Sequence, residues 1–161
     1  MALELSTAGI KVKWAVETTA GTRPTTGYAT LPNVKSIPGY NPEPSNLQVT
    51  DLSDEVWHRY IPGLKDPGGS IGLTVNYNDT FLSGWNSLVS AYETASSDNK
   101  SLWIEFAIPN SESFYFTAIP SSLGFNGAEV DAVLENTAYL APNGEPVWAA
   151  ASTSGGATGG T

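Results

Sequence analysis

The alternation of apolar and polar residues along the chain predicts several β-strands. In residues 9–17 one face carries Ile10, Val12, Trp14 and Val16, and the other carries Lys11, Lys13, Ala15 and Glu17. Successive side chains of a strand point to opposite sides, so this pattern indicates a half-buried strand. Residues 71–77 repeat the pattern, and residues 102–108 and 113–119 are typical of two hairpin strands.

Residues 129–140 show the clearest separation of apolar and acidic positions. The even-numbered face carries Val130, Ala132, Leu134, Ala138 and Leu140, and the odd-numbered face carries Glu129, Asp131, Glu135 and Thr137. This pattern predicts a strand with one buried face and one acidic face.

The period changes after residue 78, where apolar residues recur as one stripe of an α-helix. We predict one helix over about 79–95, with Asn78 or Asp79 as its N-cap. Its core face would consist of Phe81, Leu82, Trp85, Leu88, Val89 and Tyr92.

Two segments do not fit a regular period. Residues 56–70, rich in Pro and Gly, predict a long protruding hairpin loop. A loop of that length in a compact domain is usually functional or interfacial, because its own contacts do not offset the entropy of ordering it. Residues 151–161 contain no large apolar side chain and predict an extended Gly/Ser/Thr tail. We therefore expect one domain, residues 1–150, followed by this tail.

Composition excludes several classes of function. The 161 residues carry a formal net charge of −9, which argues against tight binding of nucleic acid. The absence of cysteine removes disulfides and thiolate metal sites, and the single histidine, His58, has no second His or Cys to complete a metal site. We find no catalytic constellation and no apolar run long enough to span a bilayer, so we predict no enzyme, no cofactor, no metal and no membrane insertion.

The order of these parts, and the segment Pro62-Gly63-Leu64-Lys65-Asp66-Pro67-Gly68 in particular, resembles the major tail tube proteins of long-tailed, non-contractile (siphovirus-like) bacteriophages. The resemblance implies a mainly β fold, a two-sheet antiparallel β-sandwich with one flanking helix. It also implies homo-hexameric rings stacked into a hollow tube. Such a tube encloses the tape measure protein, conducts DNA without binding it specifically, and meets tail terminator and distal tail proteins at its ends. The subunit would be assembled in the host bacterial cytoplasm and would belong to the virion.

Two sets of residues follow as candidates for this role. The inter-ring stacking loop would consist of Trp57, His58, Arg59, Tyr60, Ile61, Pro62, Gly63, Leu64, Lys65 and Asp66. Removal of residues 59–68 would then leave a folded subunit that does not stack. The acidic candidates for the wall of the lumen are Glu129, Asp131 and Glu135, although an ordinary solvated face fits their pattern equally well. Six chains of −9 each would give a ring a charge of −54, which repels DNA.

Two alternative functions remain open on the sequence alone. A tube subunit of a contractile tail or a secretion-type machine would share the architecture. A β-sandwich carbohydrate-binding module would use exposed aromatic residues, for which Trp57 and Trp103 are candidates because they lie off the apolar faces.

Overall fold

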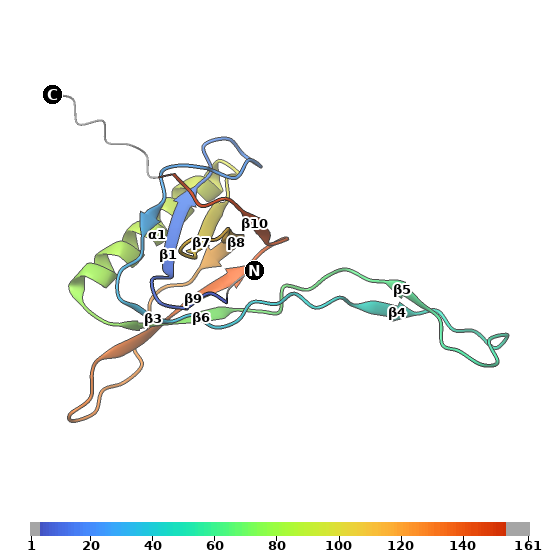
Figure 1. Ribbon diagram of the computed structural model, residues 1–161. Helices are drawn as coiled ribbons and strands as arrows, with labels where there is room; N and C mark the ends of the chain where they lie inside the picture. Colours follow the sequence, from blue (N-terminus) through green and yellow to red (C-terminus); the bar gives the residue numbers. More distant parts are fainter. Residues whose placement is uncertain (1–3, 154–161) are drawn as a thin grey trace.

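A computed structural model describes residues 4–153 and shows a curled β-sheet, one helix and a long hairpin arm (Figure 1). The mainly β fold with a single helix is confirmed for these residues. The strands are β1 (Lys11–Val16), β2 (Ala29–Thr30), β3 (Val34–Ser36), β4 (Asn46–Gln48), β5 (Tyr60–Pro62), β6 (Ile71–Asn76), β7 (Leu102–Ala107), β8 (Ser113–Pro120), β9 (Glu135–Pro142) and β10 (Val147–Ala149), and the helix α1 is Asp79–Ser97.

The main sheet is continuous rather than divided into two separate layers. Its strand order is β2-β1-β7-β8-β9-β6-β3, with β10 also paired to β8, and all of these strand pairs are antiparallel. The long strand β8 joins the two halves, because residues 114–117 pair with β7 whereas residues 118–120 pair with β9. The expected sandwich is therefore one sheet that curls on itself along β8, and the small β4-β5 ribbon is the second sheet.

The core lies on the concave side of the curled sheet, where α1 packs against β1, β7 and β8. The helix contributes Phe81, Trp85 and Leu88, each almost fully buried, while Leu82, Val89 and Tyr92 are half-buried. The indole of Trp85 also donates a hydrogen bond to the Ser121 carbonyl over 3.0 Å. The sheet contributes its inward residues: Val12, Ile71, Leu73, Val75, Leu102, Ile104, Phe106, Phe114, Phe116, Ala118, Ala138 and Leu140.

Asn78, the residue before α1, caps the start of the helix. Asn78 is extended, and its side-chain oxygen accepts a hydrogen bond from the Phe81 amide over 2.8 Å. This bond satisfies one of the amides that have no partner within the helix.

Asn78→Ala is expected to lower the free energy of unfolding by about 1 kcal/mol, because it removes this cap. Chemical denaturation followed by circular dichroism measures the change. Asn86→Ala is the matched control, since Asn86 is exposed in the middle of the helix and Ala has the higher helix propensity. An equal loss in both variants would contradict a capping role for Asn78.

The strand predicted over residues 129–140 begins later than expected. Strand β9 starts at Glu135, and Asp131 has a positive φ of 58°, which is incompatible with an extended strand. The partner strand explains this start. The β6–β9 register ends at Asn76↔Glu135, and beyond Asn76 the chain turns into the helix, so residues 129–134 have no strand to pair with. Val130 and Leu134, expected in the core, are exposed.

The predicted loop over residues 56–70 is one leg of a longer hairpin, residues 38–70, which we call the arm. Its two legs pair through the β4–β5 ladder and, nearer the body, through an isolated bridge between Glu43 and Asp66. Figure 1 shows the arm extending well away from the body. The Pro-rich segment 38–46, which does not look like a strand in the sequence, is the body-proximal part of the first leg.

Candidate assembly interface

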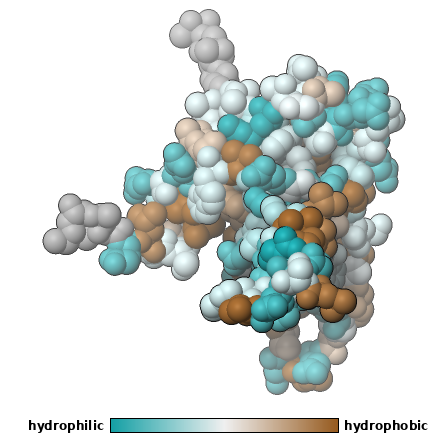
Figure 2. All heavy atoms as spheres, turned by 90° about the vertical axis from the view of Figure 1, so that its right-hand side faces the viewer, coloured by the Kyte–Doolittle hydropathy of each residue, from teal (hydrophilic) through white to brown (hydrophobic). Residues whose placement is uncertain are grey.

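The arm presents large apolar side chains to solvent from both of its legs. Figure 2, viewed from the side of the arm, shows hydrophobic residues gathered there beside hydrophilic ones. The exposed set is Leu47, Val49, Leu52, Val56, Trp57, Tyr60, Ile61 and Leu64. None of these residues belongs to the hydrophobic core of the described chain. A contiguous apolar surface of this kind is typical of a protein–protein interface.

The structure places the predicted stacking residues along the second leg of this arm. Trp57 is 81% exposed and Leu64 is 92% exposed, and Tyr60 and Ile61 are also exposed. His58, Lys65 and Asp66 lie on the surface as well, whereas Gly63 is half-buried against the Ser45 side chain. The first leg, with Leu47, Val49 and Leu52, is the part that was not predicted. The alternation of Leu47 and Val49 with polar neighbours was the signal that could have identified it.

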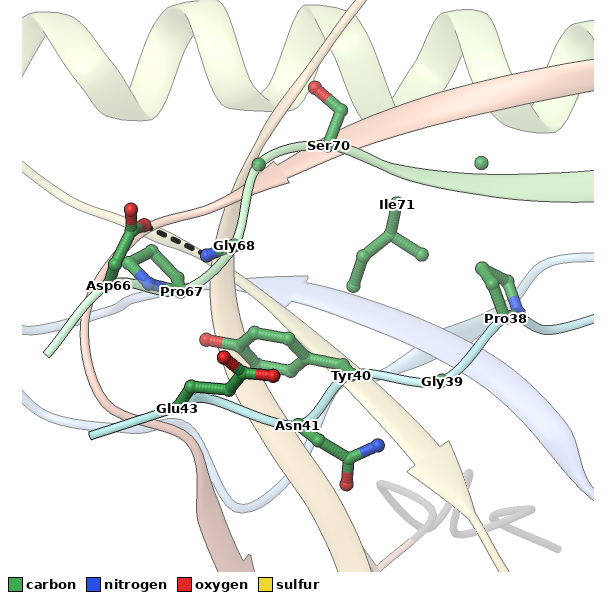
Figure 3. A pocket seen from close by; sticks show the side chains of 12 residues that line it. Pro38, Gly39, Tyr40, Asn41, Glu43, Asp66, Pro67, Gly68, Ser70 and Ile71 are labelled. Carbon is green, nitrogen blue, oxygen red and sulfur yellow. Dashed lines mark hydrogen bonds between the residues drawn. The ribbon is translucent and has the colours of Figure 1, made fainter. Parts of the chain in front are cut away.

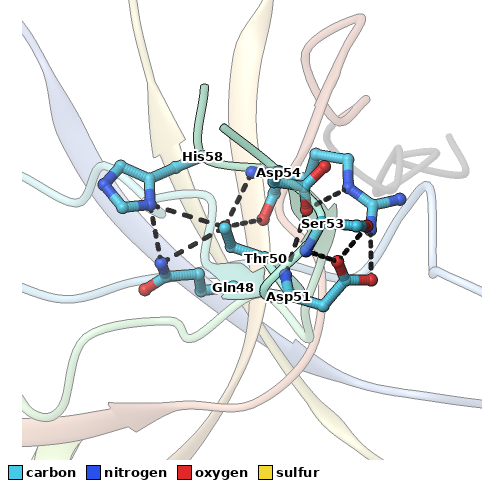
Figure 4. A network of polar contacts seen from close by, with 7 residues as sticks. Gln48, Thr50, Asp51, Ser53, Asp54 and His58 are labelled. Carbon is cyan, nitrogen blue, oxygen red and sulfur yellow. Dashed lines mark hydrogen bonds and ion pairs between the residues drawn. The ribbon is translucent and has the colours of Figure 1, made fainter. Parts of the chain in front are cut away.

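The tip of the arm is organised by ion pairs and hydrogen bonds within the hairpin (Figure 4). The Arg59 guanidinium contacts Asp54 at 2.7 Å and Asp51 at 3.1 Å. Hydrogen bonds from the side chain and backbone of Ser53 hold the pKa of Asp51 below its usual value. Arg59, predicted to contact another ring, therefore fixes the conformation of its own hairpin tip, and exposed pairs of this kind each contribute about 0–1 kcal/mol.

His58 also bonds within the arm. Its Nδ1 atom lies 2.9 Å from the side-chain nitrogen of Gln48 on the first leg. Among residues 4–153 no group of three or more His, Cys, Asp or Glu side chains is arranged to hold a metal ion. Within the same residues no helix is long and apolar enough to cross a membrane.

The root of the arm combines an open cavity with an aromatic anchor, Tyr40. A cavity of about 460 Å³ lies between the two legs where they join the body, lined by Tyr40, Glu43 and Ile71 among others (Figure 3). Gly68 and Gly69 turn the second leg into β6 with positive φ values of 90° and 88°, a conformation that favours glycine. Asp66 accepts a hydrogen bond from the Gly68 amide over 2.9 Å. On the other side of the cavity the Tyr40 ring packs against Phe114 and Phe116 of β8, with ring centroids 5.7 and 5.3 Å apart, so the base of the first leg is anchored on the core.

The three acidic candidates do not share one strand face. Glu135 lies at the start of β9 and forms an ion pair with Lys35 of β3. Glu129 and Asp131 lie in the exposed loop before β9. The prediction that all three occupy the polar face of one strand is wrong, because the chain between Glu129 and Glu135 turns at Asp131.

The outward face of β1, β7 and β8 is covered by two segments of the chain, the loop that follows β1 and the segment that follows β10. Glu17 is almost fully buried and accepts hydrogen bonds from the Trp103 indole at 2.9 Å and from the Gly21 amide at 2.8 Å. Trp103 is thereby engaged within the protein, which weakens its candidacy as a sugar-binding platform.

A second buried carboxylate, Glu105, is fully inaccessible and holds the C-terminal segment. It accepts hydrogen bonds from the Ser152 amide at 3.1 Å, from the Ser152 hydroxyl at 2.5 Å and from the Tyr115 hydroxyl at 3.2 Å. Burial alone would raise the pKa of Glu105, but the hydrogen bonds from Ser152, together with smaller contributions from Ser113 and the positive charge of Lys13, outweigh it and hold the pKa below the usual value. The rest of the predicted tail, residues 154–161, lies outside the described residues.

These features define a class: a β-protein that extends a long apolar hairpin from a closed body, as a subunit built for assembly does. The model of the phage tail tube protein family (TTP) matches residues 6–151, so the chain belongs to that family and is a structural subunit of a phage tail tube. The resemblance carried by the Pro62–Gly68 segment is thereby confirmed. The sequence has no significant match among curated proteins.

Solved structures of tail assemblies have the same fold at low sequence identity. A chain of the anti-feeding prophage baseplate matches with a TM-score of 0.61 and 15% identity, covering 91% of this chain and 97% of that one. The tail of a gene transfer agent particle matches with a TM-score of 0.55 and 12% identity, over 91% and 100% of the two chains. The SPP1 tail tube matches with a TM-score of 0.51 and 12% identity, over 91% and 80%.

Proposed function

We propose that this chain is the major tail tube subunit of a non-contractile phage tail and that it assembles as six-membered rings stacked into a hollow tube. Six-fold symmetry is stated for two of the similar assemblies, the anti-feeding prophage baseplate and the gene transfer agent tail. The role is structural and involves no catalytic step. Residues 1–150 act as one domain, and the Gly/Ser/Thr segment 151–161 is a tail appended to it.

The main observation that supports this proposal is the exposed apolar surface of the arm. A hairpin that projects eight large apolar side chains beyond its own core buries them only in contact with another molecule. Each copy presents the same hairpin, so a ring of copies presents a circle of arms to the next ring. Aromatic side chains such as Trp57 and Tyr60 are the residues that most often dominate interface energies.

The charge of the chain suits a conduit for DNA. The net charge is −9 per chain, and all seven Lys and Arg residues lie at or before residue 100. An acidic tube repels a polyanion, so DNA passes through it without binding. Before DNA is ejected, a tape measure protein occupies the lumen. Similar chains occur in a tube-terminating cap and in a sheath/tube terminator, which supports end proteins as further partners. The subunit is assembled in the host cytoplasm and ends as part of the virion.

A contractile system is the second candidate, because several similar structures come from contractile or related injection machines. The sheath-tube complex of an extracellular contractile injection system matches with a TM-score of 0.58. Such a tube needs an outer surface that binds a sheath protein, whereas a non-contractile tube does not. Reconstitution of bare tubes, without any sheath protein, favours the non-contractile assignment.

Negative-stain micrographs of the purified protein over a range of concentrations test the proposal. Rings or hollow tubes are expected to appear as the concentration rises, because stacking depends on mass action. A folded chain that stays monomeric at every concentration, with and without purified tape measure protein as an initiator, would overturn it.

A further inference from the structure

A second exposed apolar surface lies in the loop between β8 and β9, residues 121–134, which we call the 121–134 loop. Phe125 is 74% exposed, Val130 is 92% exposed and Val133 is 71% exposed, and Leu134 adds to the same surface. The loop is nevertheless tied to the body. The Asn126 side chain donates a hydrogen bond to Thr137, and the Asn136 side chain donates one to the Gly124 carbonyl.

The arm and the 121–134 loop leave opposite ends of the same strand pair. The arm enters β6 at Ile71, which is paired with Leu140, whereas the 121–134 loop enters β9 at Glu135, which is paired with Asn76. A strand rises about 3.3 Å per residue, so the two ends of β6 lie about 17 Å apart. Figure 1 shows the arm extending to the right of the body and the loop projecting on the far left.

A stack of identical copies needs two different, complementary surfaces on every copy. A contact made by the same patch on both partners closes into a dimer, whereas a contact between two unlike patches repeats indefinitely. Among the described residues the arm and the 121–134 loop carry the two largest groups of exposed large apolar side chains, eight and four, whereas the others, such as Val147 and Trp148 on β10, occur singly or in pairs. Their positions at opposite ends suit a repeating contact.

We infer that the arm of one copy packs on the 121–134 loop of a second copy, burying Phe125, Val130 and Val133. The inference rests on the proposed tube function and names the surface that receives the arm. A fully extended leg over residues 41–52 spans about 36 Å, roughly twice the length of β6, so the arm reaches across a neighbouring body.

Burial of apolar side chains, rather than opposite charge, drives this contact. Arg59 pairs with both Asp51 and Asp54 at the tip of the arm but offsets only one of their two negative charges. With Glu43, Glu55, Asp66 and Lys65 the arm has a net charge of −3, so both surfaces are acidic. The 121–134 loop has two acidic residues, Glu129 and Asp131, and no basic residue. Lys65, next to Leu64, can face these carboxylates at the edge of the contact, where such pairs contribute about 0–1 kcal/mol.

The chain has no native cysteine, so single cysteines report this contact directly. The arm variants are Leu52→Cys at the tip and Leu64→Cys on the leg, and the loop variant is Val130→Cys; all three sites are exposed. Ser90→Cys on the exposed face of α1 is the matched control. Each variant, alone and in pairwise mixtures, is treated with a short bismaleimide at high protein concentration, and the wild-type chain is examined for tubes by negative-stain microscopy at the same concentration.

A mixture of an arm variant with Val130→Cys is expected to give about tenfold more cross-linked dimer than either variant alone or either mixed with Ser90→Cys, because contact raises the effective concentration. Tubes without cross-linking from either arm position would overturn the inference and leave the tube function intact. Cross-linking of an arm variant with itself would show an arm–arm contact and also overturn it. Mixed dimers without tubes would support the contact while refuting the tube function, and the absence of both would refute both.

Discussion

Replacement of residues 44–65 by an Asn-Gly turn is expected to abolish tube formation and to leave a folded, monomeric body. The replacement keeps the Glu43↔Asp66 bridge, which then closes a two-residue hairpin loop, a favoured turn for Asn-Gly. It removes all eight exposed apolar side chains of the arm and none of the core. The free energy of unfolding should change by less than about 1 kcal/mol, as for substitutions outside the core.

Sedimentation velocity and negative-stain microscopy measure the loss of assembly, and circular dichroism measures the fold. This design is sharper than removal of residues 59–68 alone, which would strip β4 of its partner and leave the first leg exposed. Ser90→Ala, a change on the exposed face of α1, serves as the control and should assemble normally. Tubes of normal appearance from the arm-less chain would disprove a stacking role for the arm.

Glu105→Ala is expected to lower the free energy of unfolding by about 3 kcal/mol, the second-largest effect that we predict. The substitution leaves the Ser152 amide and hydroxyl without their shared acceptor in a buried site, whereas the Tyr115 hydroxyl keeps the Ala150 carbonyl as an acceptor at 2.7 Å. The segment that follows β10 is then released from the sheet. Chemical denaturation of the full-length chain at low concentration measures the loss, and Glu112→Ala, an exposed change in the adjacent hairpin turn, is the matched control.

The stabilising effect of the Glu105 carboxylate should depend on pH in the acid range. Its pKa in the folded protein lies below the ordinary value of 4.5, so its contribution is complete above that value and is lost as the pH falls through the folded-state pKa. The difference in stability between the wild-type chain and Glu105→Gln should therefore shrink as the pH is lowered below 4.5. A difference that is constant from neutral to acid pH would contradict the assigned hydrogen bonds.

Local periodicity predicts the elements whose environment is uniform along their length. The stripe of α1 identifies its buried residues because the whole helix lies against one sheet, and Asn78 marks its start. The hairpin of β7 and β8 follows for the same reason, since the two strands are neighbours in both sequence and space.

Periodicity fails where a distant segment decides the environment. Glu17 and Glu105 occupy polar positions of their strands, yet segments far away in the sequence cover them, as the hydrogen bonds from Trp103 and Ser152 show. The start of β9 depends on where β6 ends, and β6 ends because the helix begins. No local pattern around residues 129–134 contains that information.

The sequence predicted only part of the candidate interface, the second leg of the arm. The second leg of the arm carries an evident motif from Pro62 to Gly68, whereas the first leg pairs over only three residues and includes a Pro-rich segment. Residues 129–134, the last part of the 121–134 loop, were predicted to be strand because their apolar residues, Val130 and Leu134, alternate by chance with acidic ones.

The placement of the arm and the 121–134 loop at opposite ends of β6 and β9 gives any stack of these subunits a polarity. At one end of the stack the arms have no neighbouring subunit to contact, and at the other end the 121–134 loops remain uncovered. The two ends therefore differ in chemistry, in the rate at which they add subunits and in what can cap them. A protein that stops growth at one end must accept a hairpin, and a protein that starts growth at the other must supply one.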